Sequence, residues 1–492
     1  MYECAMFGDS GVMSGAQLFI KDELKISDVQ IEILVGTINI YSIVGSMAAG
    51  YTSDRIGRRL TIVVASAFFF VGALLMGFAT NYTFLMVGRF VAGIGVGYAL
   101  TIAPLYAAEV SPTSSRGFLT SFAEVFINVG VLLGFISNYA FSKLPVNLGW
   151  RFMLGLGALP SAFLAIGVLA MPESPRWLVM QGRLGEAKHV LDRTSESLQE
   201  SQIRLANIKE VVGIPENCQD DIVPVPKRQE AQGVWRELLL HPTPSVKHIL
   251  LAGLGIHFFQ QSSGIDACVL YSPIIFGKAG IHKDSDKLLT TVAVGFSKTI
   301  FILVATFLLD KIGRRPLLLV SAGGMILSQI GLGIGLTVIK NSNEKVTWAI
   351  VLCVFCVLSC VAFFSIGMGP IPWVYNSEIY PLRLRAQGCS LGAALNRLTS
   401  GVLLMTFISL YKSITIGGAF FLYAGIATMA WVFFYTLLPE TQGRSLEEME
   451  ALFGTFFRWR SKMRELDGND REGRKSNHGG DNIREMRSPD QC

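Results

Sequence analysis

Long apolar segments, separated by short polar ones, recur along almost the whole chain. A helix needs roughly 20 mainly apolar residues to cross about 30 Å of hydrocarbon. Twelve segments meet or approach this length, at positions 4–20, 34–53, 60–79, 83–107, 118–141, 151–171, 247–277, 287–310, 316–338, 347–377, 385–412 and 417–438. Because 51% of all residues are hydrophobic and only 16% are charged, the core of a water-soluble protein could not bury these segments. We therefore predict an all-α membrane protein.

Positive charge is distributed unevenly between the short connections. Lys and Arg are frequent at 54–59, 111–116, 310–315 and 381–385, whereas the connection at 80–82 has none. Cytoplasmic loops retain Lys and Arg during membrane insertion, so the basic connections are predicted on the cytoplasmic side. An even number of spans puts both ends of the chain on that side as well.

Two polar stretches interrupt the apolar pattern. We expect residues 176–246, which contain helical patterns and a Pro-rich piece, to form a cytoplasmic helical linker. This linker separates an N-terminal six-helix bundle at 1–175 from a C-terminal six-helix bundle at 247–440. The remaining residues, 441–492, form a cytoplasmic tail whose end is rich in charge, Gly and Asn, and we expect it to be largely disordered.

The two predicted bundles repeat one another. Positions 54–59 read Asp-Arg-Ile-Gly-Arg-Arg, and positions 310–315 read Asp-Lys-Ile-Gly-Arg-Arg. Glu109 and Glu378 each lie seven residues before an arginine. Parallel repeats of about six helices form a site at their interface near the membrane midplane, where rocking exposes it to each side in turn. Repetition alone would also suit a channel, but the repeated charges favour moving halves.

The repeated charges lie at the cytoplasmic ends of predicted helices. Opposite charges on neighbouring helices can pair there, and pairs that break when the bundles rock would form a cytoplasmic gate. The alternative is that the basic residues only set the orientation of the chain in the membrane. The candidate gate residues are Asp54, Arg58, Glu109, Arg116, Asp310, Arg314, Glu378 and Arg385.

Eight motifs resemble those of the sugar porter family of the major facilitator superfamily. They are GVMSGA (11–16), GYTSDRIGRR (50–59), GRF (88–90), PLYAAEVSP (104–112), PESPRWL (172–178), QQSSGID (260–266), GPIPWVYNSEIYPLRLRAQG (369–388) and PETQGRS (439–445). The motifs span nearly the whole chain, and within the family it is most similar to plant polyol/monosaccharide proton symporters. The resemblance implies the major facilitator fold and the transport of a polyol or monosaccharide.

The resemblance also implies a set of substrate contacts. In the family, the sugar site is lined by positions that match Gln260, Gln261, Asp266, Trp373, Gly369 and Asn396. Amide groups both donate and accept hydrogen bonds, which suits neighbouring hydroxyls, and an indole offers a flat apolar face to C–H groups. The alternative is that the amides join helices to one another.

Three ionisable residues, Glu124, Asp266 and Lys298, lie inside otherwise apolar spans. A charge at the centre of a membrane helix costs roughly 2.5–3.5 kcal/mol unless it is paired or hydrated. Hexose-specific relatives commonly carry amides at the matching positions, so these charges resemble the polyol branch of the family. We predict that Lys298 is neutralised by Asp266, Glu124 or both, in a polar wall that admits linear and cyclic polyols. The alternative is a purely structural ion pair.

Proton coupling requires a carboxylate that titrates as the site changes access, ideally beside a cation. Asp9 and Arg89 match the family positions that form this pair in proton-coupled members. The alternative for Arg89 is a fixed bond between helices. Only eight residues precede Asp9, where relatives have a longer segment. Either the N-terminus is shortened or the first helix is incomplete.

We therefore expect proton-coupled symport of polyols of the sorbitol, mannitol, inositol or xylitol type, or of monosaccharides, by alternating access. The alternatives are a proton-independent uniporter and a non-transporting sugar sensor. The expected partners are the polyol or monosaccharide, the proton and the lipid bilayer. We expect the plasma membrane as the location, with the vacuolar membrane as the alternative.

Other classes of protein have little support in the sequence. The eight cysteines show no paired or metal-like spacing, and no Ser-His-Asp set or phosphate-binding loop indicates an enzyme. A net charge of +5, scattered over short connections, does not form a nucleic-acid surface. We expect no catalytic residue, cofactor, metal or nucleic-acid partner.

Overall fold

The computed structural model of the chain describes residues 2–111, 116–215, 220–223, 238, 242–281, 283–342, 346–381 and 384–442. Within these ranges the chain is almost entirely helical, which confirms the predicted all-α fold. Ten of the described helical segments are long and apolar enough to cross a membrane. A helix satisfies its own backbone hydrogen bonds, which is the condition for lying in hydrocarbon.

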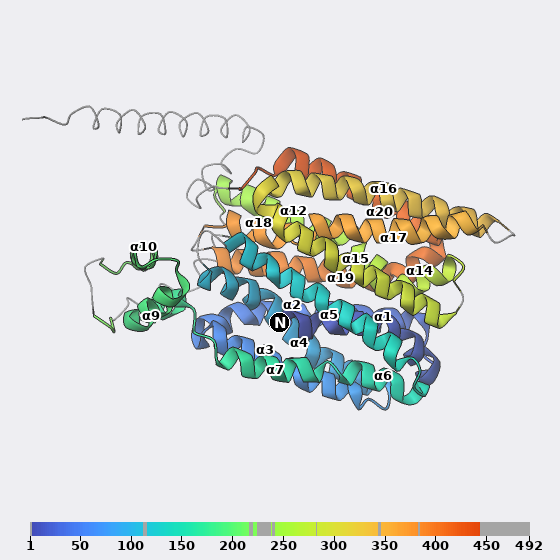
Figure 1. The fold of residues 1–492 in the computed structure, drawn as a ribbon, viewed down its shortest axis with the longest axis horizontal. Coiled ribbons are helices and arrows are strands. Elements are labelled where there is room, and N and C mark those ends of the chain that lie inside the picture. Colours follow the sequence, from blue (N-terminus) through green and yellow to red (C-terminus); the bar gives the residue numbers. More distant parts are fainter. Residues whose placement is uncertain are drawn as a thin grey trace, which may run out of the picture.

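The N-terminal bundle forms one half of the molecule (blue to teal in Figure 1). Its helices are α1 (Tyr2–Leu24), α2 (Asp28–Ile56), α3 (Arg58–Gly77), α4 (Tyr82–Val110), α5 (Arg116–Phe141), α6 (Val146–Gly155) and α7 (Ala158–Leu169). The first helix is longer than the predicted span of 4–20. Its 23 residues rise by about 34 Å at 1.5 Å per residue, which is enough to cross the hydrocarbon core.

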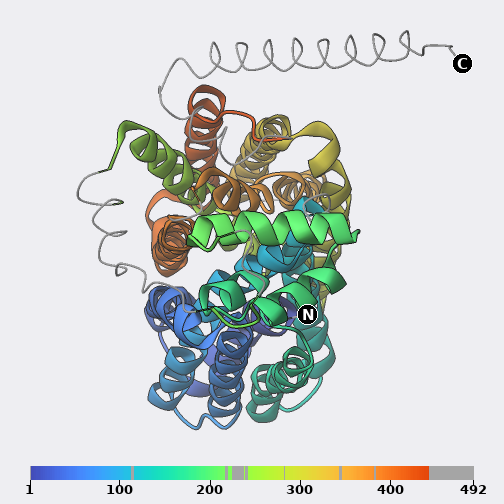
Figure 2. The same ribbon diagram turned by 90° about the vertical axis from the view of Figure 1, so that its left-hand side faces the viewer.

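The C-terminal bundle forms the other half, and Figure 2 shows the two bundles end-on. Its helices are α12 (Pro244–Ser262), α13 (Ile265–Leu270), α14 (Ser272–Lys278), α15 (Asp284–Ile312), α16 (Arg314–Asn341), α17 (Thr347–Ile366), α18 (Ile371–Ile379), α19 (Arg385–Ile414) and α20 (Ile416–Leu437).

Three short helices lie between the bundles in the sequence and at one end of them in space (Figure 1). They are α8 (Pro175–Met180), α9 (Leu184–Thr194) and α10 (Leu198–Val212), which share a small apolar core. The Trp177 indole N–H donates to the backbone oxygen of Asp54 at 3.1 Å, and Arg204 donates to that of Ser111 at 2.9 Å. These contacts tie the short helices to the basic connections, and so locate the end of the molecule that the charge pattern predicts to be cytoplasmic.

Three predicted spans are broken rather than continuous, and one of them, at 151–171, is divided between α6 and α7 by a turn at 156–157. The span at 247–277 is divided into α12, α13 and α14, with a first break at Gly264, where φ is +79°. The span at 347–377 is divided into α17 and α18 by a turn at 367–370. A continuous apolar run has the same composition in a straight helix and in a broken one, so the run itself could not reveal these breaks. Backbone groups freed at such breaks need partners within the protein.

The two bundles meet chiefly where α2 packs against α19 and where α5 packs against α15. The approach of α2 to α19 is very close at Gly36. A Cβ atom on Gly36 would lie 2.4 Å from Cγ of Met405 and 2.9 Å from the backbone oxygen of Gly401. A side chain at this position would therefore push the two helices apart.

Candidate functional site

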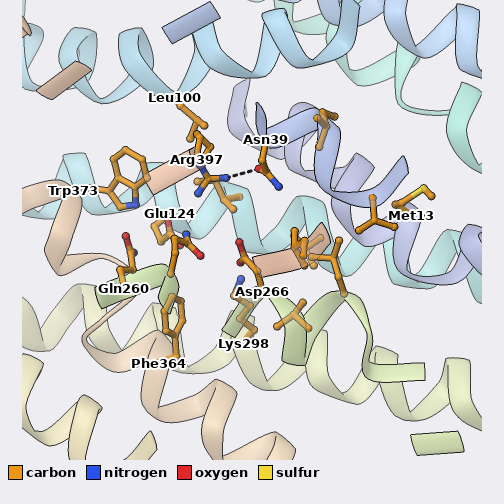
Figure 3. Close-up of a pocket in the computed structure, with 18 of the residues that line it drawn as sticks. Met13, Asn39, Leu100, Glu124, Gln260, Asp266, Lys298, Phe364, Trp373 and Arg397 are labelled. Carbon is orange, nitrogen blue, oxygen red and sulfur yellow. Dashed lines mark hydrogen bonds between the residues drawn. The ribbon is translucent and has the colours of Figure 1, made fainter. Parts of the chain in front are cut away.

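A cavity lies between the two bundles, and side chains from both bundles point into it (Figure 3). Of the predicted substrate-binding residues, Glu124, Gln260, Gln261, Asp266, Lys298 and Trp373 line this cavity. The other lining residues are Met13, Val35, Ile38, Asn39, Arg89, Leu100, Ile127, Val131, Val269, Leu270, Phe364, Arg397 and Leu404. The wall thus combines apolar surface with a few convergent polar groups, as ligand sites commonly do.

Gln260 is anchored by the break between α17 and α18. Its Nε2 donates to the backbone oxygens of Met368 at 2.8 Å and Gly369 at 2.9 Å. Its Oε1 accepts a hydrogen bond from Nδ2 of Asn396 at 2.8 Å. The predicted residues Gly369 and Asn396 are therefore brought to the site as partners of Gln260, behind the residues that line the cavity.

Trp373 lies in the first turn of α18, directly after the same break, and its indole borders the cavity (Figure 3). The ring packs edge-on against His257, with 4.9 Å between ring centroids and an interplanar angle of 66°. The chain break before α18 and the packed imidazole thus set the position of the indole. This arrangement leaves an aromatic surface available to a ligand.

Charged side chains of both signs share the cavity. Glu124 comes from α5, Asp266 from α13, Lys298 from α15 and Arg397 from α19, and Figure 3 labels all four. Within the part of the chain that the structure describes, neither carboxylate approaches the Lys298 amine to the 4.0 Å of an ion pair. Opposite charges that share a cavity offset one another's cost of burial, and each remains available to a polar ligand.

The sequence did not lead us to two polar residues of the cavity, Asn39 and Arg397. Arg397 is 6% exposed, and its Nη1 donates to Oδ1 of Asn39 at 3.2 Å, as the dashed line in Figure 3 marks. A signal was available for the arginine, because it lies inside the predicted span at 385–412 and charges within spans are costly. Asn39 is uncharged, so the cost of a charge within a span did not point to it.

The structure describes only one side chain of the proposed proton-coupling pair, Asp9 and Arg89. Arg89 on α4 is 1% exposed and lines the cavity. The backbone of Asp9 belongs to α1, which packs against α4, whereas the Asp9 side chain lies outside the described residues. The structure brings the cation to the cavity, and the pairing with Asp9 remains a prediction.

A buried ion pair lies at the cytoplasmic end of the N-terminal bundle. Nε of Arg58 is 3.1 Å from Oε2 of Glu109, and the two residues are 3% and 7% exposed. Asp54 adds a second carboxylate, 3.2 Å from Nη1 of Arg58. The carboxylate of Glu173 accepts the backbone N–H of Arg58 at 2.9 Å and so caps the start of α3. The Arg116 side chain lies outside the described residues.

The C-terminal bundle repeats this network. Nη2 of Arg314 lies 2.9 Å from Oε1 of Glu378, and the carboxylate of Glu440 accepts the backbone N–H of Arg314 at 2.9 Å. Arg385 donates to the backbone oxygen at the end of α18 at 3.4 Å. The Asp310 side chain lies outside the described residues. Both described ion pairs therefore join helices of the same bundle.

The tight connection between α2 and α3 leads to a prediction about stability. Gly57 has a φ of +94°, and a Cβ atom there would lie 2.4 Å from Oε2 of Glu173. Gly57→Ala should therefore cost about 1–3 kcal/mol, and we expect a lower apparent melting temperature for the detergent-solubilised protein. Gly167→Ala is the matched control, because an added Cβ there meets nothing within 4 Å. Equal melting temperatures for the two variants would contradict this prediction.

At the opposite end from α9 and α10, the bundles bond to each other. Glu32 on α2 is 2% exposed, and its carboxylate accepts the backbone N–H and the hydroxyl of Ser409 on α19, both at 2.8 Å. Asp28 pairs with Lys21 of α1 at 2.5 Å and also with Lys412 of α19. The interface is therefore held closed at the end opposite α9 and α10, which the charge pattern predicts to be the outer side.

Comparison with known proteins agrees with this architecture. The family model described as "Sugar (and other) transporter" matches residues 4–453. Putative polyol transporter 1 of Arabidopsis thaliana is 66% identical over 450 residues, which cover 91% of this chain and 88% of the relative. Polyol transporter 5 of the same species is 64% identical, over 94% of this chain and 86% of the relative.

Solved structures show the same two-bundle arrangement. The proton:xylose symporter XylE, bound to 6-bromo-6-deoxy-D-glucose, superposes with a TM-score of 0.78 at 25% identity, over 92% of this chain and 97% of that chain. The inward open conformation of XylE from E. coli gives a TM-score of 0.70 at 25% identity, with the same coverage. The chain therefore belongs to the sugar transporter family of the major facilitator superfamily, and it is a multi-pass membrane transporter.

Proposed function

We propose that the chain carries polyols, and monosaccharides of similar size, across a membrane together with a proton by alternating access. The observation that carries this proposal is the cavity between the bundles, where amides, an indole and charges of both signs converge. The names of the two Arabidopsis thaliana relatives support the substrate class, since both are named as polyol transporters, one of them putative. We place the protein in the plasma membrane, where an inward proton gradient can drive uptake.

The cavity suits a polyhydroxy compound for chemical reasons. A vicinal diol presents neighbouring groups that each donate and accept, and the amides of Gln260 and Gln261 offer the complementary groups. The C–H face of the same compound can rest on the indole of Trp373. Glu124 and Asp266 accept from hydroxyls, while Lys298 donates to them. Because charges of both signs line the cavity, the site suits a neutral ligand with many hydroxyls.

Proton coupling is supported by the position of Arg89 and by the XylE relative, whose structure is described as that of a proton:xylose symporter. A buried guanidinium in the cavity wall stabilises the charged form of a nearby carboxylate. If Asp9 is that carboxylate, the proton it binds or releases changes the charge balance of the site. The proton and the polyol are then linked through one cavity.

Alternating access requires the closed outer side to open while the cytoplasmic side closes. In the gate proposal, the buried networks around Arg58 and Arg314 stabilise the cytoplasmic helix ends in one of the two access states. When the bundles rock into the other state, the ion pairs of these networks break, and they form again on the return. The repetition of the networks in both bundles supports this proposal.

The gate proposal predicts a change in transport rate. Removing one partner of a buried ion pair is strongly destabilising for the state that contains it. The double variant Glu109→Gln and Glu378→Gln should therefore alter the maximal rate of uptake several-fold, with a smaller effect on the half-saturation concentration. Glu196→Gln, in the connection between α9 and α10, is the control. An unchanged maximal rate in the double variant would overturn the gate proposal.

The substrate class is tested by uptake in yeast cells that express the chain. Labelled sorbitol, mannitol, inositol, xylitol and glucose are compared with cells that carry the empty vector. We expect saturable uptake of at least one polyol, and its loss when Gln260 is replaced by Ala. The proposed substrate class fails if the protein reaches the membrane and none of these compounds enters faster than in the control cells.

A further inference from the structure

Arg397 is a buried cation whose partners lie in both bundles. It lies in the middle of α19 and lines the cavity. Its Nε donates to Oδ1 of Asn396 at 3.0 Å, within its own bundle. Its Nη1 donates to Oδ1 of Asn39 at 3.2 Å, on α2 of the opposite bundle (Figure 3). A single side chain thus connects the cavity wall with the interface between the bundles.

Asn396, the partner of Arg397 in the C-terminal bundle, links Arg397 to Gln260, a predicted substrate-binding residue. Asn396, which accepts from Arg397, donates through Nδ2 to Oε1 of Gln260 at 2.8 Å. Gln260 in turn is fixed to the chain break that precedes α18. A continuous set of hydrogen bonds therefore runs from Asn39 in one bundle to Gln260 in the other.

A second set of contacts leads from Arg397 to a carboxylate. With the Gln261 amide turned so that its oxygen faces the guanidinium, that oxygen accepts from Nη2 of Arg397 at 3.1 Å. The Gln261 nitrogen then donates to Oδ2 of Asp266 at 2.9 Å. Asp266 also accepts from the hydroxyl of Ser400, which lies on α19 near Arg397. The cation and the anion are linked by an amide, and both line the cavity.

The acceptors around Arg397 are amide oxygens. Among the described residues, the hydrogen bonds of its guanidinium go to Asn39, Asn396 and Gln261. A hydroxyl oxygen accepts a hydrogen bond as an amide oxygen does. These bonds use four of the five guanidinium N–H groups, so one N–H on Nη1 is left to donate to a hydroxyl of the ligand. The cavity edge of Arg397 is therefore suited to the hydroxyls of a polyol.

We propose that Arg397 is a substrate-binding and specificity-determining residue, and that its bond to Asn39 couples polyol binding to the contact between the bundles. This inference rests on the proposed function and deepens it. Hydroxyls of the polyol bind to the guanidinium, which is held in place by Asn396 and Gln261. Movement of the guanidinium toward or away from the ligand then changes its bond to α2, and so biases closure of the outer side.

The test compares Arg397→Lys, Arg397→Gln and Asn39→Ala in the full-length protein, with uptake normalised to the amount at the membrane. Both Arg397 variants should raise the half-saturation concentration for sorbitol about tenfold or more, since a hydrogen bond to a charged group is lost. The shift should be larger for sorbitol than for glucose. Asn39→Ala should lower the maximal rate several-fold with a smaller change in half-saturation, because the guanidinium remains in the cavity.

Gln17→Leu is the matched control. It removes another hydrogen bond between the bundles, from Nε2 of Gln17 to the backbone oxygen of Leu270 at 3.1 Å, and the Gln17 side chain is not among those that line the cavity. We expect it to leave the ratio of sorbitol to glucose affinity unchanged. A wild-type protein that takes up none of the five compounds of the yeast experiment would defeat the proposed function itself. Normal uptake by the wild type, with unchanged affinities in both Arg397 variants, would overturn only the role of Arg397.

Discussion

Replacing Lys298 by Met is expected to lower polyol uptake about 100-fold, because an uncompensated charge inside a membrane helix costs roughly 2.5–3.5 kcal/mol and each 1.4 kcal/mol is a factor of ten. The methionine keeps the length of the side chain and removes its charge. Asp266 and Glu124 then share the cavity with the guanidinium groups of Arg397 and Arg89, and no longer with the Lys298 amine. The carboxylates would repel each other and would lose a donor that the polyol hydroxyls require.

The double variant Lys298→Met with Asp266→Asn separates charge balance from a direct role of the lysine. We expect a partial recovery of uptake, because neutralising one carboxylate restores the balance while the missing amine still weakens binding. Lys188→Met, on the exposed surface of α9, serves as the control for expression and handling. Uptake by Lys298→Met at the wild-type level would rule out the polar wall.

The sequence was informative about the fold because hydrocarbon imposes a simple rule on length and polarity. Apolar runs located the membrane helices, and the repeated motif at 54–59 and 310–315 located the two bundles. The apolar runs alone do not show the breaks in α12–α14 and α17–α18, although Gly264 and the Gly-Pro pair at 369–370 are residues that commonly interrupt helices. Those breaks are where the backbone oxygens of Met368 and Gly369 meet Gln260.

Residues of the candidate site were predictable where their charge is costly to place inside a membrane helix, or where they belong to a family motif. Glu124, Asp266 and Lys298 stood out as charges within spans, and all three line the cavity. Arg397 could have been found by the same argument. Asn39 could not, since its partner is 358 positions away and depends on how α2 and α19 pack. The capping of α3 by Glu173 and of α16 by Glu440 depends on the same kind of packing and was not predicted from the sequence.

Replacing Asp9 by Asn is expected to abolish accumulation of the polyol against its gradient while slower equilibration persists. A membrane potential of 100 mV contributes about 2.3 kcal/mol for each transported proton, which corresponds to about 50-fold accumulation. An amide cannot carry that proton. Uptake by the wild type should also rise as the external pH falls, and this dependence should be lost in the variant.

The matched control for this variant is Asp22→Asn, which changes an exposed carboxylate at the outer end of the same helix. It should accumulate polyol as the wild type does. Concentrative uptake by Asp9→Asn, at the wild-type ratio of internal to external polyol, would remove Asp9 from the coupling mechanism and would leave Arg89 with a purely structural role.

The most direct measurement uses the purified protein in liposomes with an alkaline interior and an acidic exterior. Labelled sorbitol, or the best polyol from the yeast experiment, is followed with and without a protonophore. We expect the internal concentration to exceed the external one, and to fall back to it when the protonophore is added. Equilibration to the same internal concentration, with or without the proton gradient, would contradict proton-coupled transport and would indicate a uniporter.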